Sequence, residues 1–165
     1  MQLTGKQIVE KGIITNYCDE GIQQQGVDVR VKSILRVNQE LEGVVPKQGK
    51  TRLPGGMIEK VDDNTFFSLE PGYYEVEFEE ACKIPSNMVL NYKTRSSLVR
   101  CGALIHSGQF DAGFETEHMG AFLHVINPIM IEKGARLAQA IVSESYPVNN
   151  EDLYNGQWQG DKQRG

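Results

Sequence analysis

Residues 121–142 read AFLHVINPIMIEKGARLAQAIV, and this stretch decides the fold class. It holds three runs rich in β-branched and apolar residues, at 121–126, 129–131 and 137–142. Asn127-Pro128 and Lys133-Gly134 separate these runs with typical turn signals. Closely spaced short strands of this kind are typical of a β-sandwich or barrel.

The same pattern continues towards the N-terminus. Further strands are predicted at Ile13-Ile14, Val27 to Val37, Tyr73 to Phe78 and Met88 to Leu90. Residues 3–11 predict one short helix, which Thr4 can cap and Gly12 can end. Residues 38–65 are polar and are interpreted as a long excursion between strands.

Length and composition predict one soluble domain. The chain has 165 residues, so we expect a single domain over 1–165. From Asn149 onwards the sequence is polar and glycine-rich, with little to bury. Residues 149–165 are therefore predicted to form a mobile tail that orders only on binding.

Charge and cysteine content exclude several partners. The net charge is −5 and no Lys/Arg cluster occurs, which argues against binding to nucleic acid or to an anionic membrane. The N-terminus lacks a signal-peptide core, and no apolar run is long enough to span a membrane. The three cysteines form no CxxC pair, so a cytoplasmic location is expected.

Two segments could carry chemistry. Arg95-Ser96-Ser97 offers a guanidinium, hydroxyls and backbone donors that suit phosphate oxygens, although a solvated turn would have the same composition. Asp111 lies between Phe110 and Phe114, where a carboxylate could act as a base towards water. A carboxylate that merely caps a turn is the alternative. The residues alone leave both alternatives open.

The three histidines are given no functional role. His106, His118 and His124 form no HExxH motif, and the chain has no GxSxG or P-loop pattern. A single histidine in a β protein is more often structural than catalytic.

Six segments, in order along the chain, resemble the dUTPase/dCTP deaminase superfamily. Any one of them is weak, but their order and spacing together are specific. They are Gly26-Val27-Asp28-Val29-Arg30, Leu69-Glu70-Pro71-Gly72, Thr94-Arg95-Ser96-Ser97-Leu98, Phe110-Asp111-Ala112-Gly113-Phe114, Gly134-Ala135-Arg136-Leu137-Ala138-Gln139 and Tyr154-Asn155-Gly156-Gln157-Trp158-Gln159-Gly160.

The resemblance implies an all-β, distorted jelly-roll subunit. It also implies a homotrimer with active sites between subunits, and a deoxynucleoside triphosphate bound with Mg²⁺. By the same resemblance, Asp111 would activate water, Asp28 would order the metal through water, and the tail would close over the phosphates. The substrate-binding residues would be Arg95, Ser96, Ser97, Gln109, Phe114, Gln139, Tyr154 and Trp158.

One position separates the two activities of the superfamily. Deaminase-type members carry a proton-shuttling glutamate ten residues after the motif aspartate, and here that count reaches Ala121. Alanine cannot move a proton, so the sequence predicts a dUTP diphosphatase that releases dUMP and pyrophosphate. A dCTP deaminase, with Glu117 placed nearer the site by a register slip, remains an alternative. A regulatory protein that binds nucleotide without hydrolysing it remains another.

The segment from His106 to Asp111 is expected to form the hairpin that recognises the base. It is two residues shorter than in typical deaminases. Base specificity is therefore the property that the sequence determines least.

Overall fold

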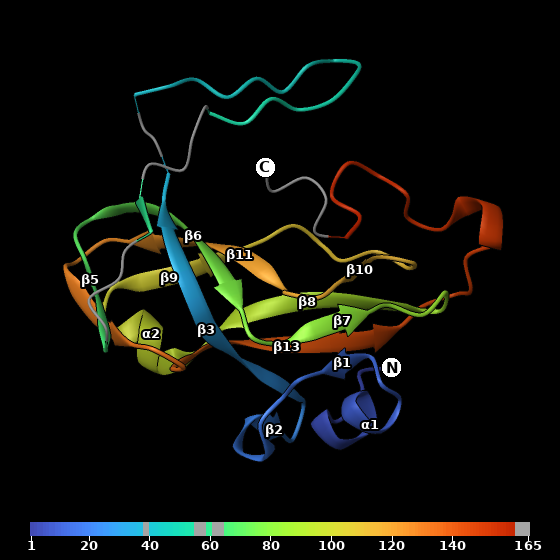
Figure 1. Cartoon of the computed structure of the whole chain (residues 1–165). Coiled ribbons are helices and arrows are strands. Elements are labelled where there is room, and N and C mark those ends of the chain that lie inside the picture. Colours follow the sequence, from blue (N-terminus) through green and yellow to red (C-terminus); the bar gives the residue numbers. More distant parts are fainter. Residues whose placement is uncertain (38–39, 55–58, 61–64, 161–165) are drawn as a thin grey trace.

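The protein folds into a partly closed β-barrel with short flanking helices (Figure 1). The structure is a computed structural model that describes residues 1–37, 40–54, 59–60 and 65–160. Within these ranges, no helix combines the length and apolar character that crossing a membrane requires.

The main sheet has the order β8-β13-β3-β6-β11-β9, and β2 and β4 also pair with β3. Its strands are β2 (Ile22–Gln23), β3 (Gly26–Arg36), β4 (Glu59–Lys60), β6 (Gly72–Phe78), β8 (Met88–Thr94), β9 (Ala103–His106), β11 (Gly120–Val125) and β13 (Arg136–Glu144). All the strand pairs are antiparallel, so one face of each strand can point to the core while the other meets water.

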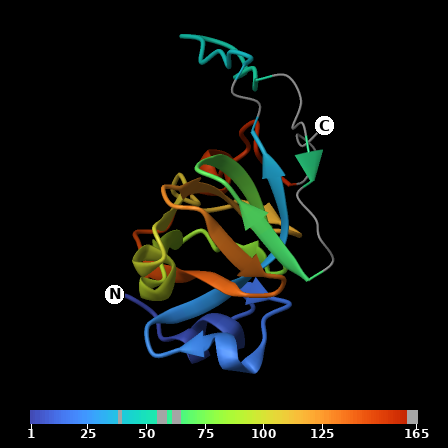
Figure 2. The same cartoon turned by 90° about the vertical axis from the view of Figure 1, so that its left-hand side faces the viewer.

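The two outer strands of this sheet, β8 and β9, approach each other and nearly close the barrel. The Thr94 hydroxyl bridges to the backbone of Ile105, at 3.0 Å from its nitrogen and 3.2 Å from its oxygen. Further along, Leu90 and Phe110 exchange two backbone hydrogen bonds of 2.9 and 3.1 Å. Figure 2 looks roughly along the strands and shows the sheet wrapped around itself.

Two small sheets, two short α-helices and two 3-10 helices complete the described part of the fold. One sheet joins β1 (Ile14–Thr15), β7 (Ala81–Lys83) and β10 (Glu115–Thr116), and the other joins β5 (Phe66–Leu69) to β12 (Ile129–Glu132). The α-helices are α1 (Gly5–Glu10) and α2 (Ser96–Arg100), and the 3-10 helices are η1 (Asp19–Gly21) and η2 (Asn150–Asp152).

Helix α1 confirms the predicted cap. The Thr4 hydroxyl accepts from the backbone N–H of Gln7 at 3.2 Å, and the Gln7 side chain accepts from the backbone N–H of Thr4 at 2.9 Å. This reciprocal pair satisfies two donors that the first turn leaves free. The helix is shorter than the predicted span of 3–11, since it ends at Glu10.

Alternation of side chains places the core inside the barrel. On β3, Val27, Val29 and Val31 are buried in the core, and Asp28 lies on the opposite face between them. The strands predicted around 27–37, 73–78, 88–90, 121–126, 129–131 and 137–142 are confirmed with small shifts of their ends. The predicted all-β barrel is therefore confirmed.

Candidate functional site

The first group of predicted site residues gathers across three neighbouring strands. Asp28 on β3 stands opposite Gln139 on β13, and Gln139 in turn stands opposite Lys93 on β8. Residues that are directly opposite in a sheet share one face, so these three side chains form a row. Arg95 follows the end of β8, and Arg136 begins β13.

Asp28 is the centre of this group. Its side chain is only 2% exposed, and Oδ2 lies 3.1 Å from Arg95 Nε and 3.4 Å from Arg136 Nη1. Oδ1 accepts from Gln139 Nε2 at 3.4 Å. Burial raises the pKa of Asp28, while Arg95, Arg136 and Gln139 act in the opposite direction. A buried carboxylate with these partners holds three donor side chains in fixed positions.

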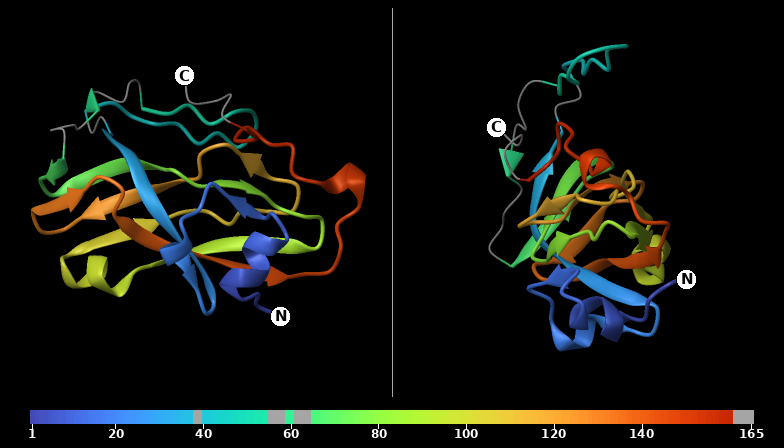
Figure 3. Two further views of the ribbon diagram at one scale, coloured as in Figure 1. Left: turned by 60° about the horizontal axis from the view of Figure 1, so that its bottom comes forward. Right: turned by 90° about the vertical axis from the view of Figure 1, so that its right-hand side faces the viewer.

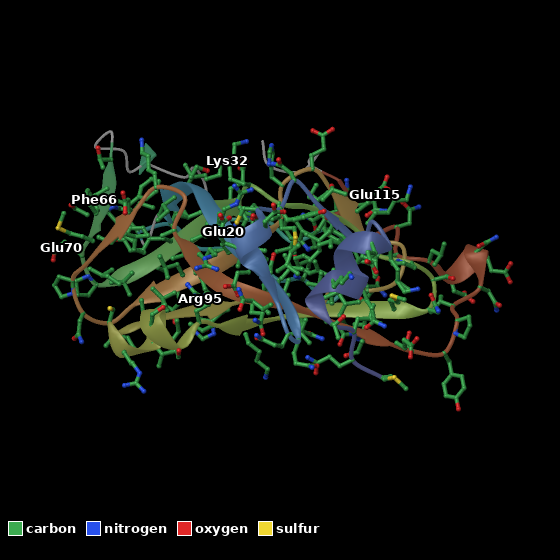
Figure 4. All side chains as sticks on the ribbon, turned by 90° about the horizontal axis from the view of Figure 1, so that it is seen from below. Glu20, Lys32, Phe66, Glu70, Arg95 and Glu115 are labelled. Atoms are coloured by element: carbon green, nitrogen blue, oxygen red, sulfur yellow. The ribbon has the colours of Figure 1, made fainter. Side chains whose placement is uncertain are left out.

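The arginines of this group are also tied to the backbone. Arg95 Nη1 donates to the carbonyl oxygen of Arg136 at 3.1 Å, and Arg136 Nη1 donates to the carbonyl oxygen of Glu20. Figure 4 shows Arg95 and Glu20 on the side of the sheet that carries this group. Ser96 and Ser97 are exposed and form the first turn of α2, next to Arg95. This group therefore presents several kinds of hydrogen-bond donor: guanidinium groups, an amide, hydroxyls and the N–H groups of the first turn of α2. Such donors can bind the oxygens of a polyphosphate.

The second group surrounds Asp111. This residue is exposed, and its Oδ1 accepts from Gln109 Nε2 at 2.9 Å. Phe114 packs between Phe110, at 5.0 Å between ring centroids, and Tyr154, at 5.5 Å. Asp111 and Tyr154 both line an open groove of about 540 Å³, to which Met88 and Gln109 contribute as well.

The C-terminal tail lies directly against this second group. Tyr154 N donates to the carbonyl oxygen of Ala112 at 2.8 Å, and Gly160 N donates to that of Glu115 at 2.9 Å. Gly113 adopts a φ of +89°, and a Cβ at this position would lie 2.8 Å from that of Leu153. Only glycine permits so close an approach of the tail. Residues 149–160 are thus docked, and the predicted ordering by ligand remains a prediction; residues 161–165 lie outside the described part.

The two groups are separated within the chain. Asp111 follows Phe110, which pairs with Leu90 near the start of β8, whereas Arg95 follows the end of that strand. Arg95 lies five residues beyond Leu90 along extended backbone, which corresponds to roughly 17 Å. Within the chain, Asp111 is therefore not next to Arg95 and Gln139.

Two local predictions are corrected by the structure. The segment from His106 to Asp111 forms no hairpin. Ile105 and Phe110 both hydrogen-bond to residues of β8, and only residues 107–109 form an irregular link between them. Arg95-Ser96-Ser97 is not the solvated turn, since Arg95 occupies the N-cap position of helix α2 and the two serines begin the helix.

Two cationic residues of the first group carried no role in the sequence analysis. Arg136 lay within a family-like motif, but only the structure shows that its side chain, opposite Arg30 in the sheet, reaches Asp28. Lys93 precedes the Arg-Ser-Ser segment and is exposed beside Gln139. For Arg136 the sequence offered its charge and its place in the motif, and for Lys93 it offered only the charge.

Ala121 lies on the inner face of β11, opposite Val76 of β6. Its side chain is 6% exposed and belongs to the hydrophobic core, as does that of Leu123. This position therefore supplies no group that could transfer a proton.

Comparisons with known proteins agree with this architecture. The model of the dCTP deaminase-like family matches residues 2–145. A deoxyuridine 5'-triphosphate nucleotidohydrolase of Methanocaldococcus jannaschii is 34% identical over 154 residues, covering 91% of this chain and 94% of the relative. A probable enzyme of the same name from Aeropyrum pernix is 31% identical over 169 residues, covering 98% and 99%.

A solved structure shows the same fold at lower identity. The 2'-deoxycytidine 5'-triphosphate deaminase from Agrobacterium tumefaciens superimposes with a TM-score of 0.65 at 18% identity. The superposition covers 91% of this chain and 50% of that one. Because the family model spans most of the sequence and the relatives align over nearly their full length, this chain belongs to the dCTP deaminase-like family.

Proposed function

We propose that this chain hydrolyses dUTP to dUMP and pyrophosphate. The observation that carries this proposal is the similarity to dUTP nucleotidohydrolases over nearly the whole chain. The site supports it, because one group of residues suits a polyphosphate and the other presents an exposed carboxylate beside aromatic rings.

The reaction needs one base and one incoming water. Asp111 accepts a proton from water as the water oxygen attacks the α-phosphorus. The bond from this phosphorus to the bridging oxygen breaks, and pyrophosphate leaves with the electron pair of that bond. Gln109 holds Asp111 Oδ1 at 2.9 Å, which leaves Oδ2 for the water. Positioned water and charge stabilisation account for most catalysis in phosphoryl transfer.

Binding of the phosphates falls to the first group. Arg95, Ser96, Ser97 and Gln139 present donors to the phosphate oxygens, and Asp28 keeps Arg95 and Gln139 in place. Phe114 and Tyr154 offer aromatic surface to the sugar, and Trp158 lies further along the same tail.

Magnesium belongs to this proposal as the counter-ion of the triphosphate. Mg²⁺ usually keeps several waters and binds through substrate phosphates with few protein ligands. Asp28 fits such an ion only through its water shell, because Oδ1 and Oδ2 already accept from Gln139 and the two arginines.

Deamination of dCTP is the less favoured function. Removal of the amino group requires a side chain that moves protons at the base, and Ala121 lies in the core at the position where the sequence count expects that group. The likeness to a deaminase structure at 18% identity concerns the fold alone.

We propose a homotrimer with shared sites: the separation of the two groups supports a site between subunits, and the family resemblance implies three subunits. We expect sedimentation to give three times the subunit mass of 18.5 kDa. In a closed ring, Arg95 and Gln139 of one subunit can face Asp111 of its neighbour. A stable, fully active monomer would contradict this arrangement.

Mixing two inactive variants tests the shared site directly. Arg95→Ala and Asp111→Asn should each abolish most hydrolysis of dUTP. Refolding them together in equal amounts should restore activity, because about one site in four then combines an intact Arg95 with an intact Asp111 from the neighbour. If each site were built within one subunit, the mixture would show only the residual activities of the two variants.

A further inference from the structure

The segment 44–52 forms a hairpin-like arm, closed by one antiparallel bridge between Val44 and Arg52, that projects beyond the barrel (Figure 1). Val44 and Arg52 hold it together by exchanging two backbone hydrogen bonds, of 2.8 and 2.9 Å. In an antiparallel pair, the N–H and C=O groups of successive residues point to opposite sides. Since the polar backbone groups of Arg52 point to Val44, those of Thr51 point outward and form a free strand edge.

Gln157 of the C-terminal tail occupies this edge. Its Oε1 accepts from the backbone N–H of Thr51 at 2.9 Å, and its Nε2 donates to the backbone C=O of Thr51 at 2.9 Å. A primary amide thereby replaces the N–H and C=O pair that a neighbouring strand would offer. Both views in Figure 3 show the tail passing beside the arm.

Gln159 makes a matching contact on the other side of the tail. Its Nε2 donates to the carbonyl oxygen of Gly113 at 2.8 Å, and its Oε1 accepts from the backbone N–H of Glu115 at 3.1 Å. Two glutamines thus join the arm to the segment that begins at Asp111. Trp158 lies between them, with its backbone N–H donating to the Tyr154 hydroxyl at 3.2 Å.

We propose that the arm 44–52 is the docking surface of the C-terminal tail and that Gln157 is a positioning residue for dUTP hydrolysis. Gln157 acts through the tail: it holds Tyr154 and Gln159 over residues 111–115, next to the water-activating carboxylate. This role rests on the proposed function, whereas the docking contact itself does not. Without the arm, the contacts of the tail end would be those of Gln159 with Gly113 and Glu115 and of Gly160 with Glu115.

Fluorescence gives a direct measure of docking, because Trp158 is the only tryptophan in the chain. In Gln157→Ala the two hydrogen bonds to Thr51 are lost. The ratio of docked to undocked tail should fall by about tenfold, which corresponds to about 1.4 kcal/mol. Quenching of Trp158 by acrylamide should rise accordingly in the ligand-free, full-length protein. Gln157→Glu keeps only the acceptor for Thr51 N–H and should change quenching in the same direction.

Kinetics then test the positioning role. In Gln157→Ala, kcat and kcat/KM for dUTP should fall together by up to about tenfold with KM unchanged, because the contact serves the transition state rather than binding. Gln48→Ala is the matched control, since Gln48 is an exposed glutamine of the same arm. It should leave quenching, kcat and the unfolding midpoint unchanged.

Each negative result has its own meaning. Unchanged Trp158 quenching in Gln157→Ala would overturn the docking surface, whatever the activity. Increased quenching with unchanged kcat would overturn the positioning role. A wild-type protein that does not hydrolyse dUTP would instead overturn the proposed function, and the quenching comparison would still decide whether the arm docks the tail.

Discussion

Asp111→Asn should lower turnover of dUTP by at least about 10²-fold, the usual scale for a positioned acid or base. The substitution keeps the shape of the side chain and the contact with Gln109, but it removes the group that accepts the proton from water. Steady-state release of pyrophosphate measures the effect. Among the described residues, Asp152 is the one other carboxylate that lines this groove, and it does so from the tail.

The affinity for dUTP separates a chemical role of Asp111 from a structural role. The affinity of Asp111→Asn for dUTP should stay near that of the wild type, because Arg95, Gln139 and Asp28 are untouched. Glu132→Gln removes an exposed carboxylate from β12 and serves as the control, with unchanged turnover expected. Wild-type turnover in Asp111→Asn would show that another group, with Asp152 the first to test, activates the water.

Removal of residues 150–165 should lower turnover on the order of 10²-fold, the scale expected when reacting groups lose their positioning. The deletion takes away Tyr154, which packs on Phe114, and Gln159, which bonds to Gly113 and Glu115. Closing a tail over the phosphates also excludes water from the reaction.

Thermal unfolding should change far less than turnover in the same truncated chain. The tail adds no member to the buried core, so its loss removes little apolar burial. Calorimetry gives the unfolding temperature and pyrophosphate release gives the turnover, both measured on one preparation. Equal losses of stability and activity would make the tail a structural element, and unchanged turnover would exclude it from the reaction.

The barrel could be predicted because its strands carry their own signals. Residues 121–142 contain apolar runs separated by turn signals, and they form β11, β12 and β13 as expected. The short strands β2, β4, β5, β7, β9 and β10 were missed. Each has two to four residues, too few for a periodic pattern, and most are held by pairing with a distant partner such as β11 for β9.

The candidate site could be predicted as a set of residues but not as a geometry. Motif order identified Arg95, Gln139 and Asp111. The contact between Arg136 and Asp28 depends on strand pairing, on an irregularity of β13 after Arg136 and on the reach of the arginine side chain, which a sequence pattern does not report. The link from Gln157 to Thr51 has no signal either, because both residues lie in polar segments whose interaction is set by the path of the chain.

Analysis of the products formed from dUTP and from dCTP tests the central claim most directly. Purified full-length protein is incubated with each nucleotide and Mg²⁺, and pyrophosphate and ammonia are measured. We expect dUMP and pyrophosphate from dUTP and no ammonia from dCTP, because Ala121 is a core residue that cannot transfer a proton. Ammonia released from dCTP by the wild-type protein would contradict this account, and so would a failure to cleave dUTP.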